Sequence, residues 1–268
     1  MKFITKSIAL SIGLFISLPS TSYAEHIWVS VAAKNTGYTK QGYESRKYFN
    51  NFADSIENRW NQGYSLVDLE YGYHRWVGIF AKGNIDKDQA YSSRREWKKF
   101  VPLLKKRQKD GYSLVNIEYG NGKWVGIFAK NKNYTYEAYE ARDELNQFKQ
   151  VIKKRWSQGY RLTDVEYGEG QWVGIFVKDK QNLKQSYAVS KRWDEIVAIT
   201  KSYWKKGYNL THLDYGYGQW FTLFSKGGKQ TSQLFSSVDD FDDFNEIIKK
   251  QWSKGYRVTN LADGRDLN

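Results

Sequence analysis

The sequence has no cysteine, two prolines, three histidines and one methionine among 268 residues. Without cysteine, the chain has no disulfide bonds, no thiol nucleophile and no lipid-bearing cysteine. The scarcity of proline and of low-complexity stretches argues against disordered linkers. Stability must therefore come from buried apolar side chains, and an aromatic content of 17% supplies many of them.

Signals for catalysis are also scarce. The histidines His26, His74 and His212 lack metal-ligand spacing, and the chain has neither a Gly-x-Ser-x-Gly elbow nor a phosphate-binding loop. A glycoside hydrolase would need two carboxyl groups in unlike environments, whereas the repeated glutamates described below have like ones. We therefore expect a non-catalytic protein with no cofactor and no metal, and a glycan-active hydrolase is the less favoured alternative.

The N-terminus predicts export. Lys2 and Lys6 precede an apolar stretch over residues 7–18, and small residues around Ala24 suit signal-peptide cleavage. The apolar stretch is shorter than the roughly 20 residues that span a membrane. We expect residues 1–24 to be a signal peptide, residues 25–268 to be one domain in the periplasm or outside the cell, and this domain to have no integral membrane segment.

The formal charge of +13 favours polyanionic partners, because long-range attraction brings such partners to a basic protein. Outside the cytoplasm these include cell-wall polymers and acidic polysaccharides. The alternative is that the chain is simply basic, as many small exported proteins are.

A period of 48 residues organises the chain. The pair Gly-Tyr recurs at residues 63, 111, 159, 207 and 255, and the run WVGIFAK at Trp76 returns at residues 124 and 172 and, more loosely, at 28 and 220. Between these motifs, Phe49, Phe52, Ile56 and Trp60 have helical spacing, and the helix should end at a glycine in left-handed conformation. After that glycine, two strand-like runs flank a short turn.

The sequence thus predicts an α+β repeat protein of five β-hairpin-plus-helix units. The hairpins are expected near residues 64–82, 112–130, 160–178 and 208–226, and the fifth combines 256–263 with 28–34. Pairing of these first and last strands would close a propeller-like ring and remove two free edges.

Polar residues kept through the copies are the candidate ligand-binding residues. A lysine ends the second strand, a carboxylate lies late in the first strand of four copies, and a hydrogen-bonding residue lies two positions earlier. These sets are Lys34, Lys82, Lys130, Lys178 and Lys226; Glu70, Glu118, Glu166 and Asp214; and Asp68, Asn116, Asp164, His212 and Asn260. Together with nearby aromatic rings they suit sugar recognition, while the structural alternative is that the lysines and carboxylates pair across strands.

Two further repeated features have structural interpretations. The tryptophans of the strands and of the helix ends are expected to pack, and a helix-end tryptophan such as Trp60 would seal its helix against the following hairpin. A Gln-x-Tyr pattern, as at Gln89 and Tyr91, is interpreted as a helix-capping device. A bulge near Val67 and Asp68 would change which hairpin residues face solvent.

The stretches 156–176 and 204–224 share the pattern Trp-x-x-Gly-Tyr followed by Tyr-Gly-x-Gly-x-Trp. This pattern resembles the repeat found C-terminal to some plant casein-kinase-I-like protein kinases and in bacterial proteins. The resemblance implies a non-catalytic accessory module, and it carries no kinase activity because the chain has no kinase domain. We predict a multivalent binder of glycan or anionic cell-envelope polymer; the alternative is a protein-interaction scaffold whose basic surface meets an acidic protein partner.

Overall fold

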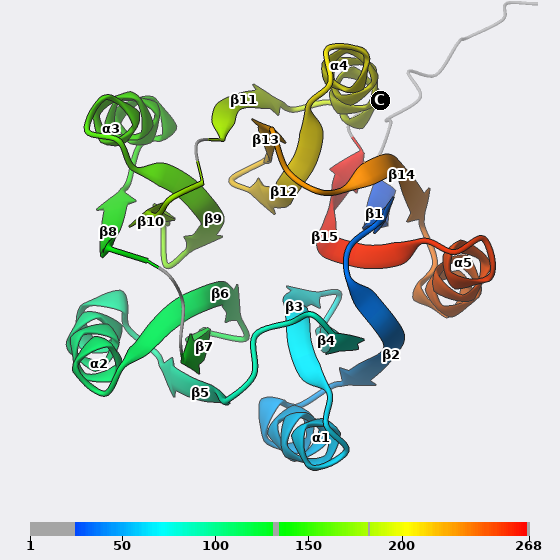
Figure 1. Cartoon of the computed structure of the whole chain (residues 1–268), viewed down its shortest axis with the longest axis horizontal. Coiled ribbons are helices and arrows are strands. Elements are labelled where there is room, and N and C mark those ends of the chain that lie inside the picture. Colours follow the sequence, from blue (N-terminus) through cyan, green and yellow to red (C-terminus); the bar gives the residue numbers. More distant parts are fainter. Residues whose placement is uncertain (1–24, 131–133, 182, 267–268) are drawn as a thin grey trace, which may run out of the picture.

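The computed structural model describes residues 25–130, 134–181 and 183–266, so the predicted signal peptide lies outside the described residues. It contains five units, each a three-stranded antiparallel sheet and one helix (Figure 1). The helices are α1 (Phe49–Asn61), α2 (Trp97–Lys109), α3 (Leu145–Ser157), α4 (Trp193–Lys205) and α5 (Phe241–Ser253).

Each sheet has a central, an inner and an outer strand. The central strands are β1 (Glu25–Lys34), β4 (Arg75–Gly83), β7 (Lys123–Lys130), β10 (Gln171–Lys178) and β13 (Gln219–Lys226). The inner strands are β3 (Ser65–Gly72), β6 (Tyr112–Gly120), β9 (Arg161–Gly168), β12 (Asn209–Gly216) and β15 (Arg257–Asp266). The outer strands are β2 (Tyr38–Arg46), β5 (Gln89–Arg94), β8 (Tyr136–Arg142), β11 (Lys184–Ser190) and β14 (Thr231–Val238).

The predicted hairpins are the inner and central strands. In β3 and β4, Tyr73 and His74 form the turn with φ values of 44° and 62°, which is the conformation of a two-residue type I′ turn. The register shifts between Leu66 and Asp68, which confirms the suspected bulge. Past the bulge, Asp68 and Glu70 are buried, and they accept backbone hydrogen bonds from β15 of the neighbouring unit.

The outer strand corrects the sequence-based interpretation. Gln89 and Tyr91 lie in β5, whereas α2 begins at Trp97 after the N-cap residue Glu96, so the capping interpretation of the Gln-x-Tyr pattern was wrong. Outer strands such as Gln-Ala-Tyr-Ser-Ser-Arg have half-buried residues without alternation, because one edge of the strand has no neighbour in the sheet. Each unit is therefore a three-stranded sheet plus a helix.

The helices end as their glycines predict. In α1, Gly63 has φ 76°; its N–H donates to the carbonyl of Trp60, and the N–H of Tyr64 donates to the carbonyl of Arg59. These two bonds form a Schellman motif, which satisfies carbonyls at the end of the helix.

The first and last strands meet. β1 pairs with β15 from Glu25–Asp266 to Ala33–Arg257, and β14 flanks β1 on its other edge. The fifth sheet thus combines both ends of the chain, as predicted. Figure 1 shows the five sheets around a common centre, with inner strands facing the centre and helices outermost.

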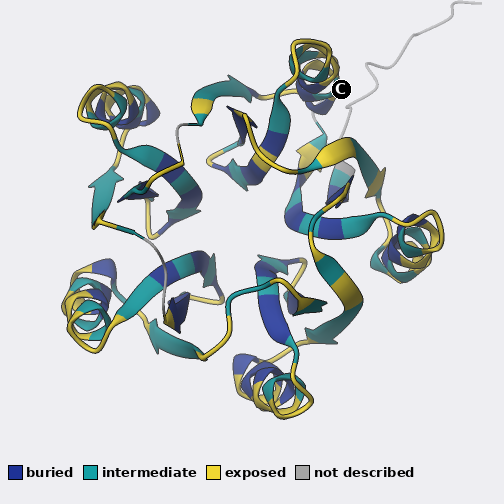
Figure 2. Cartoon of the chain, in the orientation of Figure 1, coloured by how far each residue is buried: buried dark blue, intermediate teal, exposed yellow. Residues whose placement is uncertain are grey.

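The core runs between units as well as within them. On β4, Trp76 and Phe80 pack against α1 of the same unit, whereas Val77 and Ile79 pack with Phe244 of α5. Both faces of the central strand are therefore buried, which explains why WVGIFAK is a continuous apolar run. Figure 2 shows the buried residues on the sheets and inner helix faces, and exposed residues on the outer helix faces.

Candidate functional site

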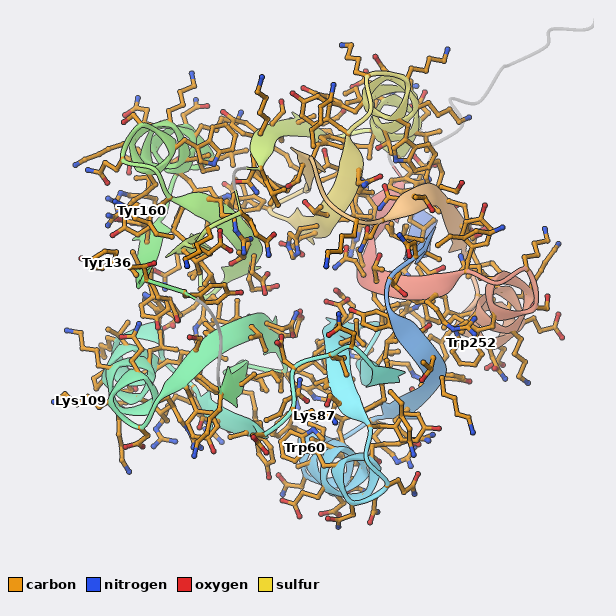
Figure 3. The ribbon with its side chains drawn as sticks, viewed as in Figure 1. Trp60, Lys87, Lys109, Tyr136, Tyr160 and Trp252 are labelled. Carbon is orange, nitrogen blue, oxygen red and sulfur yellow. The ribbon has the colours of Figure 1, made fainter. Side chains whose placement is uncertain are left out.

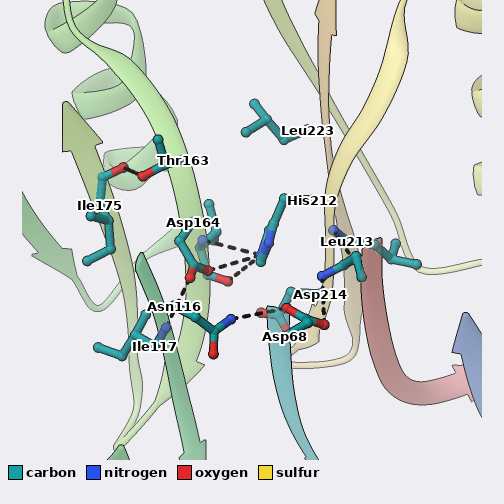
Figure 4. Close-up of polar contacts among 12 residues, drawn as sticks. Asp68, Asn116, Ile117, Thr163, Asp164, Ile175, His212, Leu213, Asp214 and Leu223 are labelled. Atoms are coloured by element: carbon teal, nitrogen blue, oxygen red, sulfur yellow. Dashed lines mark hydrogen bonds and ion pairs between the residues drawn. The ribbon is translucent and has the colours of Figure 1, made fainter. Parts of the chain in front are cut away.

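The hydrogen-bonding residues predicted from the repeat lie on the inner strands and connect neighbouring units. Oδ2 of Asp164 accepts a hydrogen bond from the N–H of Ile117 at 3.0 Å, and Oδ1 of Asn260 accepts one from Leu213 at 2.8 Å. Nε2 of His212 donates to the carbonyl of Val165 at 2.7 Å (Figure 4). Each side chain reaches a backbone group next to the bulge of the preceding unit. These residues therefore join units at places where no strand ladder exists.

Asp68 accepts hydrogen bonds from two neighbouring units. The Nδ2 of Asn116 donates to its Oδ1 at 3.1 Å, and the N–H of Leu261 donates to its Oδ2 at 2.6 Å. Asn260 also donates to Oδ2 at 3.3 Å. Asp68 is thus bonded on one side to β6 and on the other to β15.

The carboxylates two positions later are buried too. Glu118 accepts a hydrogen bond from the N–H of Tyr71, and Glu70 accepts one from Asp263. Glu70, Glu118, Glu166 and Asp214 are each at most 7% exposed. Because all four are buried, and Glu70, Glu118 and Asp214 also accept backbone N–H groups, these carboxylates are not placed to touch a ligand at the protein surface.

Burial without a cationic partner shapes the electrostatics of these groups. Burial raises the pKa of Asp68 and of Asp214 to about 7, with further repulsion from Asp214 acting on Asp68. Burial likewise raises the pKa values of Glu70, Glu118, Asp164 and Glu166 well above the usual range, and mutual repulsion adds to the effect. Burial lowers the pKa of His212 to about 4, so its ring is neutral at pH 7. The centre of the molecule therefore holds protons at neutral pH.

The five lysines lie elsewhere. Their Nζ atoms sit 4.5 to 5.7 Å from tyrosine ring centroids, in the pairs Lys34–Tyr256, Lys82–Tyr64, Lys130–Tyr112, Lys178–Tyr160 and Lys226–Tyr208. Nζ of Lys226 also donates to the carbonyl of Lys206 at the end of α4. A lysine here stabilises the negative end of the helix dipole and contacts the tyrosine face.

The structure does not bring lysine and carboxylate together as one site. On β4, Val77 faces Glu70 and Lys82 lies five residues further along, which corresponds to roughly 16 Å of strand. The cross-strand ion pairs considered as the structural alternative are likewise absent from the ion pairs of the described residues. Each set has its own structural contacts. The lysines contact tyrosine rings near the helix ends, and the carboxylates contact the neighbouring unit.

A contact between units that the sequence did not reveal involves the glutamine of the outer strand. Oε1 of Gln89 accepts hydrogen bonds from Nε1 of Trp60 and from the N–H of Leu66, and its Nε2 donates to the Leu66 carbonyl. The same Trp–Gln bond joins Trp156 to Gln185, Trp204 to Gln233 and Trp252 to Gln41. The helix-end tryptophan thus seals its unit against the next outer strand. The 29-residue spacing of Trp and Gln, kept in three copies, was the available signal, whereas in the fourth bond Trp252 reaches back to Gln41.

Clefts open beside these contacts. One of about 340 Å³ is lined by Trp60, Gly63, Tyr64, Ser65, Lys87, Asp88 and Gln89. Another of about 410 Å³ contains the equivalent residues Trp156, Gly159, Tyr160, Arg161 and Gln185, together with Lys184 and Tyr208. In Figure 3, Trp60 and Lys87 lie close together at α1, and Tyr160 lies beside α3. Two units therefore form an aromatic cleft at the same repeat positions, and each cleft also has charged side chains, Lys87 and Asp88 in one and Arg161, Asp179 and Lys184 in the other.

A comparison with known protein families identifies the family of the chain. The chain matches the DUF7477 family, a domain of unknown function, over residues 2–171 and 167–267. The chain belongs to this family. No curated protein is significantly similar to this DUF7477 protein. The resemblance to the kinase-associated repeat stays a prediction.

Two further observations concern chemistry and membranes. Within residues 25–130, 134–181 and 183–266, no three acidic, histidine or cysteine side chains are arranged to hold a metal ion. In the same part of the DUF7477 chain, no helix is long and apolar enough to cross a membrane.

Proposed function

We propose that this DUF7477 protein is an exported, non-catalytic module that binds glycan or anionic envelope polymer through repeated clefts on its rim. The observation that carries the proposal is the recurrence of one cleft at the same repeat positions, around Trp60 and around Trp156. Indole and phenol rings stack on the apolar faces of sugars, and neighbouring cations attract anionic substituents.

The charge distribution supports the proposal. Lys87 in one cleft and Lys184 in the other are exposed, and the protein as a whole has a formal charge of +13. A polymer that repeats its own groups can occupy two clefts at once, so weak single contacts add up to useful affinity.

We further propose that the units close into a propeller-like ring. The proposal rests on the pairing of β1 with β15 and on the bonds that Asp68 receives from both β6 and β15. A closed ring fixes the spacing of the clefts, which a repeating ligand would have to match.

The test is a sedimentation assay with insoluble peptidoglycan and a soluble-glycan array, at low and at high salt. Tyr64→Leu combined with Tyr160→Leu keeps an apolar side chain but removes one tyrosine ring from each cleft and leaves Trp60 and Trp156 in place, so glycan retention should fall. Lys109→Ala is the matched surface control, because Lys109 is exposed on α2 and lines neither of these clefts. It removes one charge without touching an aromatic face.

Retention that persists at high salt and disappears in the Tyr64/Tyr160 variant supports a stacked sugar. If the protein retains no glycan or envelope polymer even at low salt, the proposal fails. Salt-sensitive capture of an acidic protein instead would favour the scaffold alternative.

A further inference from the structure

The second unit has a basic groove that its neighbours lack. In the first unit, Glu44 lies between two arginines: its Oε1 is 2.7 Å from Nη2 of Arg59, and its Oε2 is 2.9 Å from Nη2 of Arg46. In the third unit, Glu140 has the same place, with Arg155 on one side and Arg142 at 3.1 Å on the other. Each carboxylate is shared by a helix arginine and a strand arginine.

The second unit keeps both arginines but loses the carboxylate. Arg107 and Arg94 occupy the helix and strand positions, and Ser92 stands where the first and third units have glutamate. Nε and Nη2 of Arg107 donate to Oγ of Ser92 at 3.1 and 3.0 Å, the same two nitrogens that hold the glutamate in the first unit. Nη1 of Arg94 donates to the carbonyl of Ser93 at 2.7 Å. Among the described residues, neither arginine has an ion pair with a carboxylate.

The second unit also has a groove beside the position where the carboxylate is missing. A groove of about 510 Å³ lies between β5 and α2, and its lining includes Ser92, Arg94, Lys99, Lys106, Arg107 and Asp110. Lys99 pairs with Glu96, and Asp110 is the one carboxylate of this lining. Four cationic side chains thus face a space that in the first and third units contains a glutamate side chain.

We propose that this groove binds an oxyanion group of a ligand, a phosphate, sulfate or carboxylate, between Arg94 and Arg107. An arginine fork matches the oxygen spacing of such groups, and its charge-assisted bonds are stronger than neutral ones. Lys106 adds a further positive charge to the lining of the groove. The inference stands apart from the glycan clefts, because none of the groove residues lines them.

The repeat supplies both test variants. Ser92→Glu places the carboxylate of the first and third units between the two arginines, so it should abolish anion binding and raise the melting temperature. Glu140→Ser creates the missing-carboxylate arrangement in the third unit, so it should add a second anion site. Both side chains already occur at these equivalent positions, which favours correct folding of both variants.

The experiment is a titration with inorganic phosphate. Binding is monitored by isothermal titration calorimetry and by the shift in melting temperature, and chloride at equal ionic strength is the reference. Wild-type protein should bind phosphate saturably. Ser92→Glu should bind it about tenfold more weakly or not at all, and a tenfold loss of affinity corresponds to about 1.4 kcal/mol. Polyphosphate in place of phosphate distinguishes a polymer-bound group, which should bind more tightly, from a free ion. Equal responses to phosphate and chloride, or equal phosphate binding by wild type and Ser92→Glu, would overturn the inference.

Discussion

Oδ2 of Asp68 accepts a hydrogen bond of 2.6 Å from the backbone N–H of Leu261, which lies 193 residues further along the chain. Asp68 belongs to the first complete hairpin and Leu261 to the last strand. The bond therefore joins the beginning of the repeat to its end. Beside it, β1 pairs with β15 along nine residue pairs from Glu25–Asp266 to Ala33–Arg257.

Removal of the last strand should strongly destabilise the protein. A chain that ends at Lys254 lacks β15, which exposes the edge of β1 and the apolar surface around Val29 and Val31. We expect the melting temperature to fall by about 10 °C or more, or the protein to aggregate. Differential scanning calorimetry is the measurement, with a chain that ends at Asp266 as control.

An open array would respond differently, because its stability is a sum of nearest-neighbour terms and loses only one of them. A truncated chain that melts within a few degrees of the control would therefore contradict the proposed ring.

The sequence predicts much of each unit, for identifiable physical reasons. The helix and the two hairpin strands have periodic or continuous apolar patterns, such as Phe49-Phe52-Ile56 and WVGIFAK, that local rules can interpret. The outer strand was missed because residues such as Gln89 bond to the preceding unit rather than forming an alternating face. The repeat also identified Asp68 and its equivalents as special positions. It could not assign their role, since the bulge at Val67 and the neighbouring unit decide where they point.

Stability should fall as pH rises from 5 to 8. The folded-state pKa of Asp68 and of Asp214 is about 7, compared with an ordinary value of 3.8, so the folded state binds more protons than the unfolded state between these values. Unfolding free energy therefore decreases with rising pH across this window. His212 acts oppositely below about pH 6.5, because its folded-state pKa is about 4, but it is one group against several carboxyls. Melting temperatures at a series of pH values measure the net effect.

Asp214→Asn isolates one contributor. Oδ1 of Asp214 accepts the N–H of Tyr215, a bond that asparagine can keep. The variant should be more stable than wild type at pH 8, and this difference should shrink as pH falls and vanish only below about pH 3.8, where the unfolded carboxyl is also protonated. A pH profile parallel to that of wild type would show that Asp214 is ionised in the folded state and contributes nothing to the slope.

In four of the five inner strands, a glycine near the strand end packs against an aromatic ring of the preceding unit, whereas Gly72 of β3 packs against Asp263. A Cβ atom on Gly120 would lie 2.2 Å from Cγ of Tyr71, and one on Gly168 would meet Tyr119 in the same way. Gly120→Ala should therefore destabilise the protein by about 1–3 kcal/mol through overpacking. Denaturant unfolding measures this loss, and Gly228→Ala, where a Cβ meets nothing within 4 Å, is the control.

The cause can be separated from a backbone effect. In a Tyr71→Ala background the ring is gone, so Gly120→Ala should add little further loss, and the pair should show strong non-additivity. If Gly120→Ala destabilises the protein equally in both backgrounds, the strain does not come from contact with the Tyr71 ring.

The second unit also differs at the joint between units. Gln108 replaces the helix-end tryptophan, and Glu137 replaces the glutamine of the next outer strand. Oε1 of Glu137 accepts hydrogen bonds from the N–H of Leu114 at 3.1 Å and from the hydroxyl of Tyr139, but a carboxylate has no N–H to donate to the Leu114 carbonyl. Burial raises its pKa, which shows that the charged form is disfavoured there.

Gln108→Trp together with Glu137→Gln should restore the contact of the other four units and stabilise the protein by about 1 kcal/mol, the net value of a typical hydrogen bond. Each single change leaves one partner without its counterpart, so the two changes should stabilise more together than the sum of their separate effects. A double-mutant cycle measured by denaturant unfolding gives this coupling. If the coupling is zero, the Trp–Gln bond does not contribute to holding units together, and the 29-residue spacing of the pair has another cause.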